Sequence, residues 1–308
     1  MLMYIADTHC DTLYALAKGR NTEELMVNRK KMLAGSVTLQ TFALFTGSNG
    51  TRGGAYSDAR RMLACMDKLE IAWLLSKLPD DYPVTPSGII SIEGGEALEG
   101  KIERLHEFYD QTALRMIALT WNYENEIGYP SKLGSEPGLK PFGLQLLKEM
   151  DRLGIYADAS HLNERGFWDI YEHMSLPPIA SHSNNREICD IHRNLTRAQI
   201  QAIIERRGYI GINFYTSFLT KNETASLDDV VRHIDSIMEM GGEDVLGFGS
   251  DFDGIEKWPL GLHDSSCFPN LINALAARGY TESQLEKLSH LNLWRLLKDA
   301  DNIREYKA

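Results

Sequence analysis

Short apolar runs rich in β-branched and aromatic residues recur along the whole chain, with segments of helical spacing between them. Eight of these runs have the length and composition of strands, and they span residues 4–8, 37–45, 88–92, 114–119, 155–159, 178–181, 209–213 and 245–250. Strands that alternate with helices form parallel sheets, because each helix returns the chain to the same end of the sheet. Eight such units predict an α/β fold, a (β/α)8 TIM-type barrel.

The intervening segments carry the periodicity and the end signals of helices. Two apolar sets at helical spacing are Met62, Met66, Leu69 and Trp73, and Leu144, Leu147, Met150 and Leu153. Capping boxes begin at Thr196, Ser226 and Thr281, and left-handed helix ends are expected at Gly154 and Gly208. Further helices follow residue 268, so we expect residues 1–308 to form one barrel domain with extra C-terminal helices.

A doubly wound open sheet is the main alternative, because it also alternates strands with helices. Open sheets that bind dinucleotides carry Gly-x-Gly-x-x-Gly directly after a strand. This chain has no such motif after any of the runs that we interpret as strands. The sequence therefore favours the barrel.

The composition predicts a globular cytoplasmic protein that binds neither nucleic acid nor a membrane. Hydrophobic residues make up 43% of the chain and charged residues 24%, and no apolar run reaches the roughly 18 residues that span a bilayer. The net charge is −11 and the basic residues are scattered, which argues against a nucleic-acid groove. The four cysteines are widely spaced, as expected for reduced thiols, and the N-terminus lacks the basic region of a signal peptide.

His9 and Asp11 follow directly after the first predicted strand. Residues two apart in an extended segment point to the same side, so an imidazole and a carboxylate would lie together where the strand leaves the core. Both groups are good ligands for divalent metals. The pair alone is weak evidence, because Asp11 could instead cap the following helix.

Other predicted strands also end in potential metal ligands, namely Glu93, His161, His182 and Asp251. The carboxyl ends of all barrel strands meet at one face, so these side chains would converge there. His9, Asp11, Glu93, His161 and His182 are enough ligands for two zinc ions that share a carboxylate. Glu93 is the natural bridge, because no lysine stands at a strand end.

These residues and their neighbours resemble the renal or membrane dipeptidase family, a branch of the amidohydrolase-type metal barrels. The matching stretches are Asp7-Thr-His-Cys-Asp-Thr, Ser91-Ile-Glu-Gly-Gly, Ala159-Ser-His, Ile179-Ala-Ser-His-Ser, Arg193-Asn-Leu, Gly211-Ile-Asn-Phe-Tyr and Gly247-Phe-Gly-Ser-Asp-Phe-Asp-Gly. The resemblance covers roughly residues 4–297. It implies a (β/α)8 fold, two zinc ions and hydrolysis of dipeptides, including dipeptides with a D-residue at the C-terminal position.

The resemblance also implies how the metals are held. His9 and Asp11 would bind one zinc ion, and His161 and His182 the other. Glu93 would bridge the two ions, which places it among the catalytic groups. Manganese or cobalt would also fit a set of histidines and carboxylates.

Asp251 and Arg193 would complete the mechanism that the resemblance implies. A hydroxide that bridges the metals would attack the peptide carbonyl, and Asp251 would pass the water's proton to the leaving amine. Asp251 would also face the substrate's free amine. Arg193 would bind the C-terminal carboxylate, which suits a planar fork of donors. Substrates would therefore need both termini free.

One position departs from the family's pattern. Its dipeptidases usually carry a histidine in a Leu-Thr-His run after the fourth strand, where it can stabilise the oxyanion, but this chain reads Leu119-Thr-Trp-Asn. Trp121 can donate an indole N–H and Asn122 an amide N–H, so either residue is a candidate for substrate binding in its place.

The departure keeps a second enzyme function open, a binuclear metal hydrolase of another amide, lactone or ester. A third interpretation is a non-catalytic metal-binding barrel, which would require the ligand set to be vestigial. The partner that we expect is a small dipeptide substrate, and the sequence is compatible with a homodimer.

Overall fold

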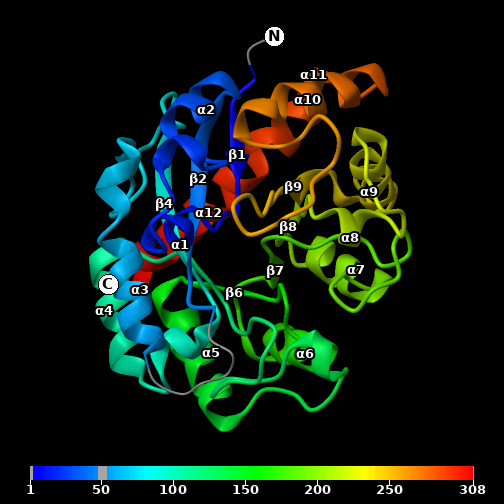
Figure 1. Cartoon of the computed structure of the whole chain (residues 1–308). Coiled ribbons are helices and arrows are strands. Elements are labelled where there is room, and N and C mark those ends of the chain that lie inside the picture. The colour runs from blue at the N-terminus through cyan, green and yellow to red at the C-terminus, as the bar shows by residue number, and fades with distance from the viewer. Residues whose placement is uncertain (1–2, 48–53, 308) are drawn as a thin grey trace.

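The computed structural model describes residues 3–47 and 54–307. The strands in this part of the chain are β1 Ile5–Asp7, β2 Val37–Phe45, β3 Ala72–Trp73, β4 Ser87–Glu93, β5 Met116–Ala118, β6 Tyr156–Asp158, β7 Ile179–Ala180, β8 Tyr209–Ile212 and β9 Leu246–Phe248. All except β3 form a closed parallel ring in the order β1-β2-β4-β5-β6-β7-β8-β9, in which β9 pairs with β1. The predicted (β/α)8 barrel is therefore confirmed (Figure 1).

Helices surround this ring and connect successive strands (Figure 1). They are α1 Thr12–Ala17, α2 Arg29–Ala34, α3 Ala55–Leu63, α4 Ile102–Thr112, α5 Pro141–Leu153, α6 Glu164–His173, α7 Arg197–Glu205, α8 Thr216–Leu219, α9 Leu227–Glu239, α10 Phe268–Ala277, α11 Glu282–Glu286 and α12 Asn292–Lys307. Within the described ranges, no helix combines the length and apolar character that crossing a bilayer requires.

The extra C-terminal helices close the end of the barrel that lies opposite the expected site. Hydrogen bonds join α12 to the first residues of two strands, because the Asn292 side chain donates to the Leu246 carbonyl at 2.8 Å and the Tyr156 hydroxyl donates to the Leu296 carbonyl of α12 at the same distance. The amino ends of the strands are thereby covered, which leaves their carboxyl ends as the open face of the barrel.

The helix expected to include Met66, Leu69 and Trp73 ends earlier than predicted. Helix α3 stops at Leu63, a 3-10 turn covers Met66–Leu69, and Glu70 adopts a left-handed φ of 53°. The chain then forms β3, and the Trp73 ring packs on Phe42 with centroids 5.0 Å apart. Burial of the indole against the barrel outweighs the helical spacing of the apolar residues.

The capping boxes at Thr196, Ser226 and Thr281 are confirmed, and so is the left-handed end at Gly154, whose φ is 66°. The expectation for Gly208 was wrong, because the left-handed residue there is Arg207, with a φ of 55°. Gly208 is needed for a different reason. A Cβ at this position would lie 2.1 Å from the carbonyl oxygen of Pro178.

We therefore expect Gly208→Ala to destabilise the barrel more than an alanine at an open left-handed glycine. Overpacking against backbone costs roughly 2 kcal/mol, and the neighbouring strand would have to shift. Gly241 is the control, because its φ is 91° and a Cβ added there would meet no atom within 4 Å. Gly241→Ala should cost only about 1 kcal/mol. Urea denaturation of both variants tests the ranking, and equal losses would contradict it.

Candidate active site

The residues selected from the sequence lie together at the open face of the barrel. His9 and Asp11 follow β1, Glu93 ends β4, His161 follows β6, His182 follows β7 and Asp251 follows β9. All of them are buried or nearly so. The parallel ring forces this convergence, because the carboxyl end of every strand points to the same face.

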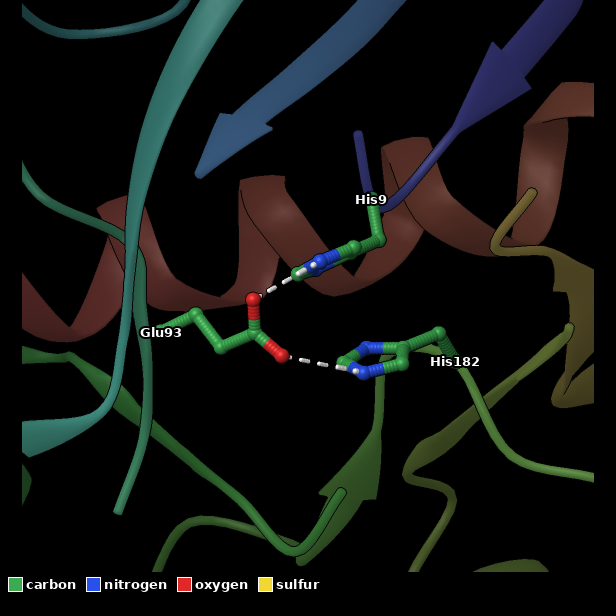
Figure 2. Close-up of side chains that lie close together, drawn as sticks. All are labelled: His9, Glu93 and His182. Atoms are coloured by element: carbon green, nitrogen blue, oxygen red, sulfur yellow. Dashed lines mark ion pairs between the residues drawn. The ribbon is translucent and has the colours of Figure 1, made fainter. Parts of the chain in front are cut away.

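Glu93 is the centre of the group, because three imidazoles surround its carboxylate. Its Oε2 lies 3.3 Å from Nε2 of His9, and its Oε1 lies 3.0 Å from Nε2 of His161 and 3.5 Å from Nε2 of His182. Figure 2 shows the carboxylate between His9 and His182, with one oxygen directed toward each ring. One carboxylate thus links two groups of side chains.

Hydrogen bonds on the far side of two rings determine which nitrogens face Glu93. Ser181 donates its hydroxyl proton to Asp158, so its oxygen accepts from Nδ1 of His182 at 2.7 Å. The side-chain oxygen of Asn122 accepts from Nδ1 of His161 at 3.0 Å. With both Nδ1 atoms protonated, the Nε2 atoms of these neutral imidazoles carry lone pairs.

These lone pairs require a positive charge between them. Nε2 of His161 and Nε2 of His182 are only 3.1 Å apart, and both face the acceptor Oε1 of Glu93. Burial and the charge of Arg193 lower the pKa of His161 to about 4, and burial holds the pKa of His182 well below its usual value. A proton is therefore a poor occupant here, whereas a divalent cation fits the donor set.

A second group of donors lies on the other side of Glu93. Nε2 of His9 and Oδ1 of Asp11 are buried and make no hydrogen bond with any described residue. Asp11 occupies the position before α1, but its side chain does not cap that helix. The capping alternative for Asp11 is thereby ruled out, and a metal ion would supply the missing partner for both atoms.

The second group also accumulates negative charge. Burial and the nearby Glu93 raise the pKa of Asp11 to about 7. Burial opposes protonation of His9, but Glu93 and Asp11 raise its pKa well above the ordinary value. Without a metal, His9 retains its proton at neutral pH, and Asp11 is partly protonated there. A bound cation would replace those protons, as metals do at histidine and carboxylate sites.

Asp251 faces the same group from β9. Its Oδ1 lies 3.9 Å from Nε2 of His9, its Oδ2 accepts from the Asn213 amide at 2.9 Å, and its backbone N–H donates to the His9 carbonyl at 3.1 Å. A Cβ on Gly254 would lie 2.7 Å from Oδ1 of Asp251 and 2.0 Å from Oδ2 of Asp11. Only glycine leaves room for both carboxylates.

Arg193 is buried beside His182. Composition alone would instead make it an exposed surface residue. Its guanidinium donates to the Ser183 hydroxyl at 3.2 Å and to the His182 carbonyl at 3.3 Å, and it lies 5.1 Å from the centre of the Phe218 ring. Its Nε makes no hydrogen bond within the described part of the chain. This buried cation can therefore still accept an anionic partner.

A cavity of about 280 Å³ lies above these groups and includes Asp11, Glu93, His161 and Asp251 in its lining. This volume is at the small end of ligand pockets, which start at roughly 300 Å³. Trp121 and Asn122 also line it. Arg193 does not, but its guanidinium lies 5.1 Å from the ring centre of Phe218, which does line the cavity.

Two further lining residues, Tyr14 and Phe45, were not selected from the sequence. In the sequence both look like ordinary core aromatic residues, so nothing in their residue type marks them as part of a site. The available signal was the position of Phe45 as the last residue of β2, at the carboxyl end where site residues gather.

The sequence profile of the membrane dipeptidases, peptidase family M19, matches residues 2–308. The chain belongs to this family. It is therefore a metallo-dipeptidase, a hydrolase of peptide bonds, and the predicted family resemblance is confirmed.

Two curated relatives are similar over about two thirds of this dipeptidase. An uncharacterised protein in the pqqA 5′ region of Klebsiella pneumoniae is 38% identical over 68% of this chain and 81% of its own length. An uncharacterised dipeptidase, C965.12, of Schizosaccharomyces pombe is 32% identical over 69% of this chain. The match spans about half (52%) of the yeast protein.

Two solved structures match nearly the whole dipeptidase. A metallopeptidase of family M19, dipeptidase AC, has a TM-score of 0.88 at 28% identity, and the match covers 97% of this chain and 99% of the other. A metallopeptidase from Rhodobacter sphaeroides has a TM-score of 0.87 at 28% identity over 96% and 99% of the two chains. The latter was solved with a phosphinate mimic of the dipeptide L-Ala-D-Ala.

Asn122 should control how tightly this dipeptidase binds metal through His161. We expect Asn122→Ala to weaken the affinity for one ion by about 10- to 100-fold, because the His161 ring loses the partner that orients it. Asn122→Asp keeps an acceptor for Nδ1 and should retain the affinity. Metal titration calorimetry on the apoprotein measures both.

The same pair separates orientation of His161 from a direct role of the Asn122 amide toward substrate. If the amide N–H stabilises the oxyanion, Asn122→Asp will lose turnover while it retains metal. Equal metal affinity in Asn122→Ala and the unaltered protein would contradict the orienting role.

Proposed function

We propose that this dipeptidase holds two zinc ions and hydrolyses dipeptides whose amino and carboxyl termini are both free, including dipeptides with a D-residue at the C-terminal position. The observation that carries the proposal is the convergence of three imidazole nitrogens on the two oxygens of Glu93. The dipeptide mimic bound by the Rhodobacter sphaeroides neighbour supports the substrate class.

In this proposal His9 and Asp11 would hold one ion, His161 and His182 would hold the other, and Glu93 would be shared between them. Histidine and carboxylate donors favour zinc, although manganese or cobalt can occupy such sets. When bound, two ions lower the pKa of a water molecule and polarise the scissile carbonyl. Because Glu93 would hold both ions, we count it among the catalytic groups.

Asp251 is proposed to move the proton. The Asn213 amide holds Oδ2, which leaves Oδ1 directed toward His9 and the cavity. Burial raises the pKa of Asp251 to about 6, close to neutral pH, where a carboxylate can both accept and release a proton. The proton taken from water would pass to the leaving amine.

Arg193 is proposed to bind the substrate's C-terminal carboxylate. Its buried charge has no carboxylate partner among the hydrogen bonds of the described residues, and its Nε is free. A substrate carboxylate would satisfy the guanidinium with paired hydrogen bonds. The guanidinium lies 5.1 Å from the centre of the Phe218 ring, which lines the cavity that the substrate would enter.

The family assignment favours an enzyme over the non-catalytic barrel that the sequence alone left open. The family assignment also favours a dipeptidase over a hydrolase of another amide, lactone or ester, the alternative that Trp121 in place of the family's usual histidine left open. Assays of the zinc-loaded protein against dipeptides, N-acyl amides and lactones separate the two functions. Turnover of lactones without turnover of dipeptides would overturn the proposal.

The cytoplasmic location and a homodimeric assembly remain predictions. All four cysteines are free and buried, which is compatible with a reducing compartment. Fractionation of cells and size-exclusion chromatography with light scattering test the two predictions.

We expect Asp251→Asn to lower kcat by about 10²- to 10⁴-fold, because an amide cannot accept the proton. The variant should still bind both ions, since Asp251 is not one of the proposed ligands. Steady-state kinetics and metal analysis by mass spectrometry are the measurements. Near-normal kcat in a fully loaded variant would contradict the proton-transfer role.

We expect Arg193→Ala to raise KM for dipeptides by about 100-fold, because a charge-assisted pair contributes roughly 1.5–3 kcal/mol. Arg193→Lys should recover only part of the loss, since an ammonium lacks the planar fork. The matched control is a dipeptide amide, which has no carboxylate. The unaltered enzyme should discriminate against the amide and Arg193→Ala should not; an unchanged ratio would exclude the assignment.

A further inference from the structure

Three aromatic side chains form one side of the cavity. We call Tyr14, Phe45 and Trp121 the aromatic wall. Tyr14 and Phe45 pack edge to face with ring centroids 5.1 Å apart at 65°, and Phe45 and Trp121 do the same at 5.0 Å and 64°. Such contacts fix each ring against the next, so the wall is a preformed surface.

The aromatic wall begins directly beside the proposed metal ligands. The Trp121 ring centroid lies 6.3 Å from that of His161. The carboxylates that line the cavity belong to other residues, namely Asp11, Glu93, Asp251, Asp253 and Glu256. The wall itself carries no charged side chain. It can therefore bury apolar area of a substrate close to the scissile bond.

The ring of strands places Phe45 opposite Arg193, whereas Trp121 follows β5, two steps from β7. Phe45 ends β2, and Arg193 lies between β7 and α7. Four steps separate β2 from β7 in either direction around the eight-stranded ring, so the two strands face each other across the barrel. A substrate whose carboxylate binds Arg193 therefore extends its other residue across the barrel toward Phe45, the central ring of the wall.

We propose that the aromatic wall is the binding surface for the side chain of the substrate's N-terminal residue, and that it selects dipeptides with a large apolar or aromatic first residue. This inference rests on the proposed function, because it takes the position of the carboxylate from Arg193. Trp121 is the specificity-determining residue, since it supplies the largest ring and its centroid lies 6.3 Å from that of His161, a proposed metal ligand.

The physical basis is the area that each side chain removes from water. A phenylalanine or leucine side chain at the first position would bury most of its apolar surface on the wall, whereas alanine would leave part of the cavity to water. A difference of this kind changes kcat/KM by on the order of 10-fold or more. An aspartate at the first position would meet several carboxylates and no lysine or arginine among the residues that line the cavity.

The test compares kcat/KM for Phe-Ala, Leu-Ala, Asp-Ala, Ala-Phe and Ala-Ala, each with an L- or D-residue in second position, on the zinc-loaded enzyme. We expect Phe-Ala and Leu-Ala to exceed Ala-Ala by on the order of 10-fold, and Asp-Ala to be the poorest. Trp121→Ala should lower the ratio of Phe-Ala to Ala-Ala by about 10-fold, and Trp121→Phe should retain most of it.

Trp168→Ala is the matched control, because Trp168 packs against Phe167 and Tyr171 of α6 and is not among the residues that line the cavity. Its ratio should equal that of the unaltered enzyme. If Trp121→Ala does not fold, as judged by its melting curve, Trp121→Leu replaces it with less loss of volume.

Several outcomes would overturn the inference while the proposed function stands. One is equal kcat/KM for Phe-Ala and Ala-Ala in the unaltered enzyme, and another is an unchanged ratio in Trp121→Ala. A third is a loss confined to Ala-Phe against Ala-Ala, which would assign the wall to the second residue. If no dipeptide is hydrolysed at all, the proposed function fails, and this inference fails with it.

Discussion

The facing lone pairs of His161 and His182 require a cation between them, and the rest of the site is arranged around this requirement. Two neutral imidazole nitrogens 3.1 Å apart, both next to a carboxylate oxygen, repel one another unless a cation lies among them. Their orientation is imposed from behind, by Asn122 on one ring and by Ser181 with Asp158 on the other. The barrel thus uses rigid polar contacts to hold an arrangement that is unfavourable without metal.

Two residues of the site, His161 and Asp251, also adopt an unfavourable backbone conformation that the surrounding structure maintains. His161 has a φ of 68° and Asp251 a φ of 65°, a region that side-chain-bearing residues enter at a cost of roughly 1–3 kcal/mol. Backbone hydrogen bonds hold each of these residues in the left-handed conformation. Ser131 donates its N–H to the His161 carbonyl at 2.7 Å, and the Asp251 N–H donates to the His9 carbonyl. Packing of the closed ring offsets the strain.

The strands and the polar residues that follow them could be predicted because their signals are local. An apolar run that ends in histidine or aspartate places that residue at the open face, whatever the loops do. The burial of Arg193 and the contacts of Phe45 and Trp121 depend on loops from different strands, so no local pattern reports them. The predictions of a helical Trp73 and a left-handed Gly208 were wrong for a related reason. Contacts with Phe42 and with the Pro178 carbonyl, remote in sequence, decided their conformations.

The pairing of β1 with β9 has a consequence for the birth of the protein on the ribosome. Ser250 donates to the His9 carbonyl across 241 residues of chain. The ring can therefore close only after β9, which pairs with β1, has been synthesised. At roughly 5–20 residues per second, translation takes about 10 to 50 s to cover that interval. During this time His9 and Asp11 are already synthesised while Glu93, His182 and Asp251 emerge in turn. The proposed ligand set is therefore complete only late in the synthesis of the chain.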